Sequence, residues 1–163
     1  MTIDRQSRTI LAELARWLIG ARITNYQFDD SVPKSDDPAV RVIYNQFLWL
    51  LYCDLKEHRL CGSDKLSAAQ REVANRCIMF LKSGLAYSWP VLSRAKSALL
   101  TLGNSLTFGI AGRIYFRRAS AAGDMVYWPF ISSSQYASSL EAPVYLAAGA
   151  NNSVRDFPST PGA

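Results

Sequence analysis

The residues best suited to metal chemistry are the three cysteines and the single histidine of the chain. Cys53, His58 and Cys61 lie in one short segment, and Cys77 could supply a fourth ligand. Zinc sites usually draw their ligands from paired short spacings such as C-x2-C. Here His58 stands between two unpaired cysteines, and the sequence has no second pair. We therefore interpret Cys53 and Cys61 as small buried thiols and expect neither a metal nor a cofactor.

An acid–base pair is the second chemical candidate. Asp54 and His58 are four residues apart, so they would face each other if they lie on one helix. Such a pair could orient a general base. Covalent catalysis would also need an activated nucleophile beside it, and the sequence places no cysteine or serine there. A solvated ion pair explains the spacing better.

The serine-rich segment 131–139 lacks the G-x-S-x-G turn of a nucleophile elbow, and helix capping accounts for it more simply. The chain also has no glycine-rich phosphate loop of the known spacings. Nowhere does the sequence combine a nucleophile, a base and a stabilising group. We therefore expect a protein that acts by binding and not an enzyme.

The segment Pro38–His58 is expected to form the central helix of the fold. Asp37 can cap it, and Pro38 suits its first turn. Apolar residues follow helical spacing on one face, and the other sides are nearly as apolar, which is typical of a helix buried among others. The residues on that face are Val40, Ile43, Tyr44, Phe47, Leu48, Leu51 and Leu55.

Further amphipathic segments predict a mainly α fold, a single-domain helical bundle. Residues 4–19 form one helix that ends at Gly20, and residues 68–83 form another that ends at Gly84. Capping-box spacing appears twice, in Thr24 with Gln27 and in Ser67 with Gln70. Helical patterns also cover residues 90–102 and, less regularly because of Gly109 and Gly112, residues 106–116.

Beyond residue 105, short β or extended segments remain an alternative. Met125–Ile131 is expected to be extended, with Pro129 confining it to a sheet edge or an irregular strand. Ser132 or Ser133 can cap a helix that ends near Leu140. We expect residues 1–148 to form the single globular domain and residues 149–163, with two prolines and few apolar residues, to form a flexible tail.

Composition indicates a folded domain with a sizeable core. The chain has 163 residues, of which 49% are hydrophobic and 19% are charged. The odd number of cysteines is typical of a reducing compartment, and charged residues interrupt the N-terminal segment where a signal peptide would be apolar. The longest uncharged stretch near the middle of the chain, 97–112, is too short to span a bilayer. We therefore expect a soluble, cytoplasmic protein.

The strongest anomaly is electrostatic. Residues Val73–Gly123, here called the basic stretch, contain seven Lys and Arg residues and no Asp or Glu, whereas the whole chain has a net charge of +5. Aromatic residues accompany it, and Arg, Tyr and Trp are enriched at binding hot spots. The candidate partner-binding residues are Arg113, Arg117, Arg118, Tyr127 and Trp128.

Two explanations of the basic stretch stay open. The acidic first half of the chain could dock against it, or an anionic partner could bind it. Among partners, another protein with an acidic surface comes first. Nucleic acid is the second alternative, since no helix-turn-helix or zinc-finger spacing is present. A membrane surface is the third, because the apolar segment 97–116 ends in arginines.

One short motif resembles a known pattern. Gly123–Asp124, followed by Trp128–Pro129–Phe130 and by Tyr136 in the next predicted helix, is similar to a pattern in uncharacterised small bacterial helical proteins. The resemblance covers the last third of the chain and implies no activity. It implies a bacterial accessory protein, such as an immunity-type inhibitor or a small subunit.

Overall fold

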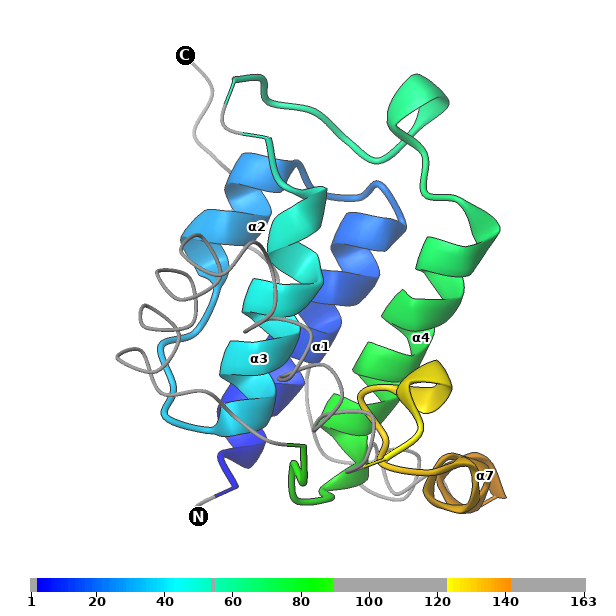
Figure 1. Ribbon diagram of the computed structural model, residues 1–163. Helices are drawn as coiled ribbons and strands as arrows, with labels where there is room; N and C mark the ends of the chain where they lie inside the picture. The colour runs from blue at the N-terminus through cyan, green and yellow to red at the C-terminus, as the bar shows by residue number, and fades with distance from the viewer. Residues whose placement is uncertain (1–2, 54, 90–122, 142–163) are drawn as a thin grey trace, which may run out of the picture.

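Every regular element that the computed structural model describes is helical (Figure 1). The described residues are 3–53, 55–89 and 123–141. The mainly α fold class is therefore confirmed. The elements are the α-helices α1 (Arg5–Ile19), α2 (Asn25–Ser31), α3 (Pro38–Gln46), α4 (Ala68–Ser83) and α7 (Ser133–Glu141), with the 3₁₀ turns η1 (Leu48–Leu51), η2 (Gly62–Asp64) and η3 (Met125–Tyr127).

Helix α1 is the centre of the packing. It contacts α2, α3 and α4, and its contact with α4 is the most extensive between any two described helices. Figure 1 shows α1 behind and between α3 and α4. Leu11, Ala12 and Ala15 on its inner face are fully buried. The small side chains of Ala12 and Ala15 let neighbouring elements approach closely, which close packing of a core requires.

The expected central helix 38–58 is wrong beyond Gln46. Its start is as predicted, because the Asp37 side chain accepts a hydrogen bond from the Ala39 N–H and Pro38 occupies the first turn. Phe47 then leaves the helical conformation with φ of −133°, and η1 follows. Leu51 is buried as expected, but Leu55 is 94% exposed.

The side chain of Asn25 provides the physical reason for this irregular course. Its amide donates to the carbonyl oxygens of Cys53 (2.9 Å) and Lys56 (3.1 Å), and its oxygen accepts from the His58 N–H (2.8 Å). The Asn25 N–H also donates to the His58 carbonyl (3.0 Å). Backbone groups that a continuous helix would pair internally are thus satisfied by the start of α2.

The predicted helix ends are otherwise confirmed. Both capping boxes form, at Thr24 with Gln27 and at Ser67 with Gln70. Gly84 ends α4 in the left-handed conformation with φ of 71°, which glycine adopts without a steric penalty. At the end of α1, Gly20 is the cap residue as expected.

Several predicted segments lie outside the described residues. They are the helical patterns at 90–102 and 106–116, the short extended piece 143–146 and the tail 149–163. Within the described ranges, no helix has the length and apolar character needed to cross a membrane.

Candidate functional site

The segment Gly123–Ile131, here called the anchor loop, carries two of the candidate binding residues. The expected extended conformation is wrong, because Met125–Tyr127 forms the 3₁₀ turn η3 and the chain then turns back. The Asp124 side chain caps η3, and the Asp124 N–H donates to the Ile131 carbonyl (3.0 Å). A Cβ at Gly123 would lie 2.5 Å from that same carbonyl oxygen, so the closure requires glycine.

Three successive carbonyl groups fix the anchor loop to the core. Arg76 Nε donates to the Trp128 carbonyl (3.3 Å), and Trp89 Nε1 donates to the carbonyls of Pro129 (3.0 Å) and Phe130 (3.2 Å). The Trp128–Pro129 peptide bond is cis. Phe130 is fully buried and meets the ring of Phe80 edge-on, with the centroids 5.2 Å apart. The Gly-Asp…Trp-Pro-Phe motif is thus an anchoring element.

Tyr127 and Trp128 are both half-buried in this loop. The Trp128 indole N–H donates to the Tyr87 hydroxyl (3.2 Å), and the Tyr127 ring lies 5.8 Å from that of Tyr136. Two neighbours that the sequence interpretation missed reach further into solvent, since Met125 is 44% and Val126 is 67% exposed. A Gly-Asp turn followed directly by two apolar residues was the signal that could have indicated them.

The other candidates, Arg113, Arg117 and Arg118, lie outside the described residues. Two cations of the basic stretch are described, and acids from outside it neutralise both. Lys82 pairs with Glu13 of α1, and Arg76 Nη1 lies 2.6 Å from Glu72 Oε1. The Lys82–Glu13 pair joins the basic stretch to the first half of the chain, whereas the Arg76–Glu72 pair is a local i, i+4 contact within α4.

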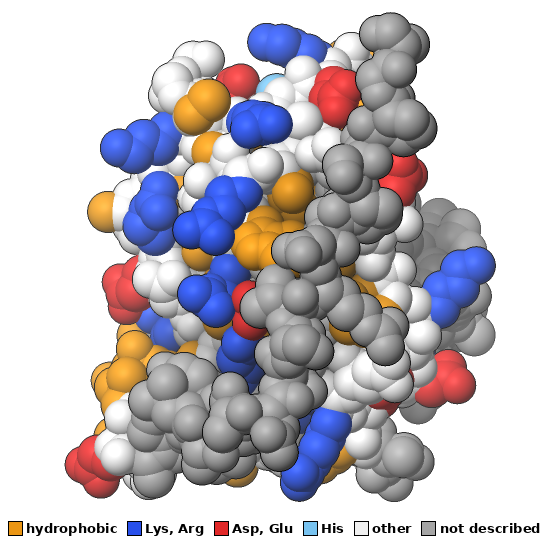
Figure 2. Space-filling model, turned by 180° about the vertical axis from the view of Figure 1, so that it is seen from behind, with side chains coloured by type: hydrophobic (Ala, Val, Ile, Leu, Met, Phe, Trp, Pro, Cys, Tyr) orange, Lys and Arg blue, Asp and Glu red, His pale blue; other side chains and the backbone are white. Residues whose placement is uncertain are grey.

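Exposed positive charge is not confined to the basic stretch. Figure 2 shows Lys and Arg side chains spread over the face seen from behind, with acidic side chains among them. Arg16, Arg22 and Arg59 are exposed arginines of the first half. The Arg59 guanidinium donates to the Ala21 carbonyl (3.4 Å), which holds it beside the end of α1.

The cysteines and the histidine are held in different environments. Cys77 is buried in α4, Cys53 is half-buried, and Cys61 is exposed, which corrects the expectation that Cys53 and Cys61 are both buried. Burial raises the pKa of the Cys77 thiol. Among the described residues, no three His, Cys, Asp or Glu side chains come together in a metal-binding arrangement.

The helix on which Asp54 and His58 were expected to face each other is absent. Residues 55–58 are not helical, and Asp54 lies outside the described residues. The His58 ring nitrogen Nδ1 is 3.1 Å from the Lys56 carbonyl. The four-residue spacing of Asp54 and His58 therefore no longer supports a general base.

The serine-rich segment serves helix α7. Ser132 Oγ accepts from the Gln135 N–H (3.3 Å), and the Gln135 side chain accepts in return from the Ile131 N–H (3.0 Å). These bonds satisfy backbone donors at the start of a helix. The capping role expected for Ser132 is confirmed.

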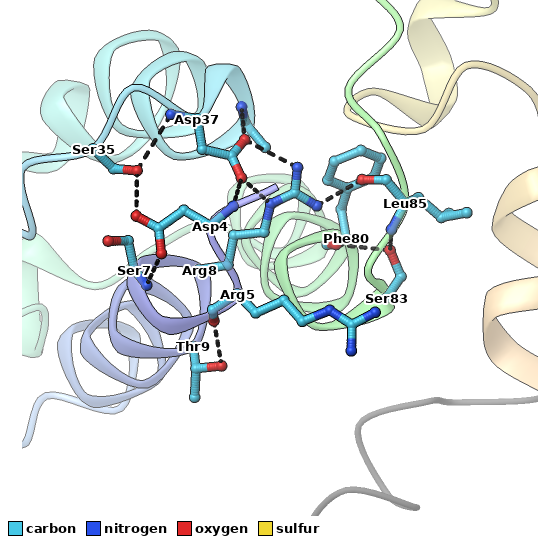
Figure 3. A network of polar contacts seen from close by, with 11 residues as sticks. Asp4, Arg5, Ser7, Arg8, Thr9, Ser35, Asp37, Phe80, Ser83 and Leu85 are labelled. Atoms are coloured by element: carbon cyan, nitrogen blue, oxygen red, sulfur yellow. Dashed lines mark hydrogen bonds and ion pairs between the residues drawn. The ribbon is translucent and has the colours of Figure 1, made fainter. Parts of the chain in front are cut away.

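A buried polar network joins the starts of α1 and α3 to the chain after α4 (Figure 3). Asp4 and Asp37 approach each other at its centre, where the Asp4 N–H donates to Asp37 Oδ2 (2.9 Å). Ser35 connects them, because its hydroxyl donates to Asp4 Oδ2 (2.7 Å) and accepts from the Asp37 N–H (3.2 Å). Arg8 completes the network by binding Asp37 and the Leu85 carbonyl.

The contacts of this network indicate that it stabilises the fold. Every buried side-chain nitrogen and oxygen in the described part of the chain has a hydrogen-bond partner. Burial opposes ionisation of Asp37, but bonds from Arg8 and from the Asp4 and Ala39 N–H groups outweigh it and lower the Asp37 pKa. A carboxylate held in this way is a poor proton acceptor at neutral pH.

Comparison with family models, curated proteins and solved structures found no match to this chain. The fold defines the class, a mainly helical protein in which α1 packs against three other helices. Function must therefore be argued from the surfaces of the molecule itself.

Proposed function

We propose that this chain is a non-catalytic binding protein that acts through protein–protein contact, as a bacterial accessory or immunity-type protein. Its binding face combines the cations Arg113, Arg117 and Arg118 with the apolar edge of the anchor loop. The partner presents an acidic surface. Tyr127 and Trp128 contribute their exposed edges to the contact.

One observation carries the proposal. Met125 and Val126 stand in solvent on a turn whose other side is bonded to the core through Trp128, Pro129 and Phe130. Apolar side chains held out on a rigid support lose little conformational freedom on binding, which lowers the cost of association. Leu140 of α7 is also 55% exposed.

The first test uses a charge-reversing variant of the exposed turn. A tagged full-length chain captures its partner from the native host, and the affinity of the purified pair is then measured. Val126→Asp should weaken binding about tenfold or more, because it removes an apolar contact and repels an acidic partner. Ile10→Ser, an exposed apolar position on α1, is the matched control. Equal affinity of Val126→Asp and the unmodified chain would exclude the anchor loop from the interface.

The second test addresses the arginines. The double change Arg117→Glu and Arg118→Glu should abolish partner binding and leave the melting temperature nearly unchanged, since exposed charges contribute little to folding. Unfolding of this variant would show instead that the arginines are internal counter-charges. A log-linear loss of affinity for DNA or RNA with salt, several units in slope, would favour the nucleic-acid alternative. Binding to lipid vesicles alone would favour the membrane alternative.

A further inference from the structure

Short-range bonds within the anchor loop give the loop its shape. The N–H groups of Tyr127, Trp128 and Phe130 each donate to the carbonyl three residues earlier, over distances of 3.0, 3.2 and 2.9 Å. These bonds bend the chain into the turn on which Met125 and Val126 are exposed. All three bonds lie inside the loop, so they do not determine where the turn sits on the core.

The placement of the loop depends on donors from outside it. Carbonyl oxygens that are removed from water need a hydrogen-bond partner, and Pro129 has no N–H with which the loop could bond in return. Arg76 donates to the carbonyl of Trp128, and Trp89 donates to the carbonyls of Pro129 and Phe130. These side chains come from α4 and from the chain shortly after it, so they connect the loop to the helical core.

Trp89 is the stronger of the two supports. Its indole N–H bonds two carbonyls at once, both contacts are buried, and the residue is only 5% exposed. Arg76 holds one carbonyl and also pairs with the exposed Glu72. Without the indole N–H, two buried carbonyl oxygens would lose this donor, and leaving such groups unsatisfied costs more than an ordinary lost hydrogen bond. The loop would reduce that cost by moving its carbonyls toward water.

A movement of the carbonyls would displace the exposed turn, because Val126 lies only three residues before Pro129. A turn that is no longer held in one place must be ordered again when a partner binds, and this ordering costs free energy. Trp89 can therefore change the affinity of the turn for a partner although its own side chain is buried.

We propose that Trp89 is a positioning residue for the exposed turn of the anchor loop. Its indole N–H holds the loop where Met125 and Val126 meet the partner, and Trp89 itself does not touch that partner. This inference rests on the proposed function, because it requires that the exposed turn lies in the interface.

The test compares two variants that lower stability for different reasons. Trp89→Phe keeps an aromatic ring but loses the N–H, whereas Ile43→Val trims a fully buried side chain of α3 and leaves that N–H in place. Melting temperatures show that both variants fold. For the purified partner used with Val126→Asp, Trp89→Phe should weaken binding about three- to tenfold, as expected for one lost hydrogen bond, and Ile43→Val should not. Equal affinities of the two variants would overturn the proposal.

A second substitution changes the hydrogen bond alone. Trp89→benzothienylalanine replaces the indole N–H by sulfur and keeps a fused ring of nearly the same shape. It should weaken partner binding by the same factor as Trp89→Phe. Unmodified affinity of this variant would overturn the proposal, even if Trp89→Phe fails to fold.

Hydrogen exchange follows the loop in the free protein. The amides of Asp124 and Phe130 donate within the loop, and such short-range bonds protect poorly once the loop leaves the core. Both amides should exchange at least about fivefold faster in Trp89→Phe, whereas those of α1 should not. Unchanged exchange in the anchor loop would overturn the proposal.

Removing the apolar turn separates positioning from a general structural role. In the double variant Met125→Ala and Val126→Ala, Trp89→Phe should change the affinity by less than about twofold, because the side chains that it positions are gone. An undiminished effect in this background would overturn the inference. If Val126→Asp itself leaves binding unchanged, the proposed function is wrong and the inference falls with it. If Val126→Asp weakens binding and Trp89→Phe does not, only the inference is wrong.

Discussion

Arg8 and Asp37 form a two-pronged ion pair that is almost sealed from water. Arg8 Nε lies 2.6 Å from Asp37 Oδ2, and Arg8 Nη2 lies 3.0 Å from Asp37 Oδ1. Their side chains are 1% and 0% exposed. The third guanidinium nitrogen, Nη1, donates to the Leu85 carbonyl (2.6 Å), so Arg8 connects α1 to α3 and to the chain that follows α4.

Replacing Arg8 should therefore be strongly destabilising. Arg8→Met leaves the Asp37 carboxylate buried without its cation, and such a loss costs about 3–5 kcal/mol of unfolding free energy. Urea denaturation measures the change. Adding Asp37→Asn should restore part of the stability, because it removes the unpaired charge and keeps an oxygen that can cap α3. A loss below about 1 kcal/mol in Arg8→Met would contradict the importance of the pair.

Acid should destabilise the fold through the same network. Hydrogen bonds from Ser7 and Ser35 lower the pKa of Asp4 from 3.8 to about 2, and the Asp37 pKa is also lowered. The unfolded chain therefore takes up protons before the folded chain does as pH falls. The stabilisation is complete above the ordinary carboxyl pKa of 3.8 and is lost as pH falls toward about 2.

Melting temperatures measured from neutral pH to pH of about 2 test this dependence. The unmodified chain should lose stability steeply in the acid range. Asp37→Asn should be less stable at neutral pH and lose less on acidification, because one of the titrating groups is gone. A parallel decline in both proteins would mean that Asp37 is not among the groups responsible.

Local signals were sufficient to predict much of the fold from the sequence. Capping depends on residues a few positions apart, and the helix 68–83, with Ser67 and Gln70 at one end and Gly84 at the other, forms with the bounds that its sequence predicts. The course after Gln46 depends on bonds from Asn25 to residues 53–58. No pattern within 38–58 indicates those long-range bonds. The apolar periodicity of this segment therefore predicted a helix that is too long.

Two leucines of the segment 38–58 differ sharply in how far their side chains are exposed. Leu51 is 9% exposed, so Leu51→Ala should cost about 2–5 kcal/mol through the cavity it leaves. Leu55 is 94% exposed, and Leu55→Ala should change stability by less than about 0.5 kcal/mol. Equilibrium denaturation of both variants checks the assignment. Similar losses in the two would contradict the irregular course of the chain after α3.

Replacing the side-chain amide nitrogen of Asn25 by an oxygen should already lower the stability of the fold. Asn25→Asp can still accept from the His58 N–H but cannot donate to the carbonyls of Cys53 and Lys56. A carboxylate facing two carbonyl oxygens should cost at least about 1–3 kcal/mol. Hydrogen exchange should then show faster opening of residues 55–58, with α4 unaffected until global unfolding. Unchanged exchange in this segment would mean that Asn25 does not hold it.

The candidate site was predicted only in part, for a related reason. The sequence indicated that Tyr127 and Trp128 belong to a special segment, because Gly, Asp, Pro and aromatic residues gather there. Its closure depends on Trp89 and Arg76, whose bonds to the backbone carbonyls of the anchor loop span 40 residues or more of sequence. Without those contacts, an extended strand was the simpler expectation for an apolar segment that contains Pro129.

The cysteines should behave as unligated thiols. Zinc binds deprotonated thiolates, and burial raises the Cys77 pKa, which disfavours that form. Cys61 is exposed, on a segment where no other described ligand converges with it. Elemental analysis of the purified chain should find no stoichiometric zinc, and a chelator should leave the melting temperature unchanged. One zinc per chain that disappears on Cys61→Ser would establish a structural metal site, because such a metal contributes directly to folding.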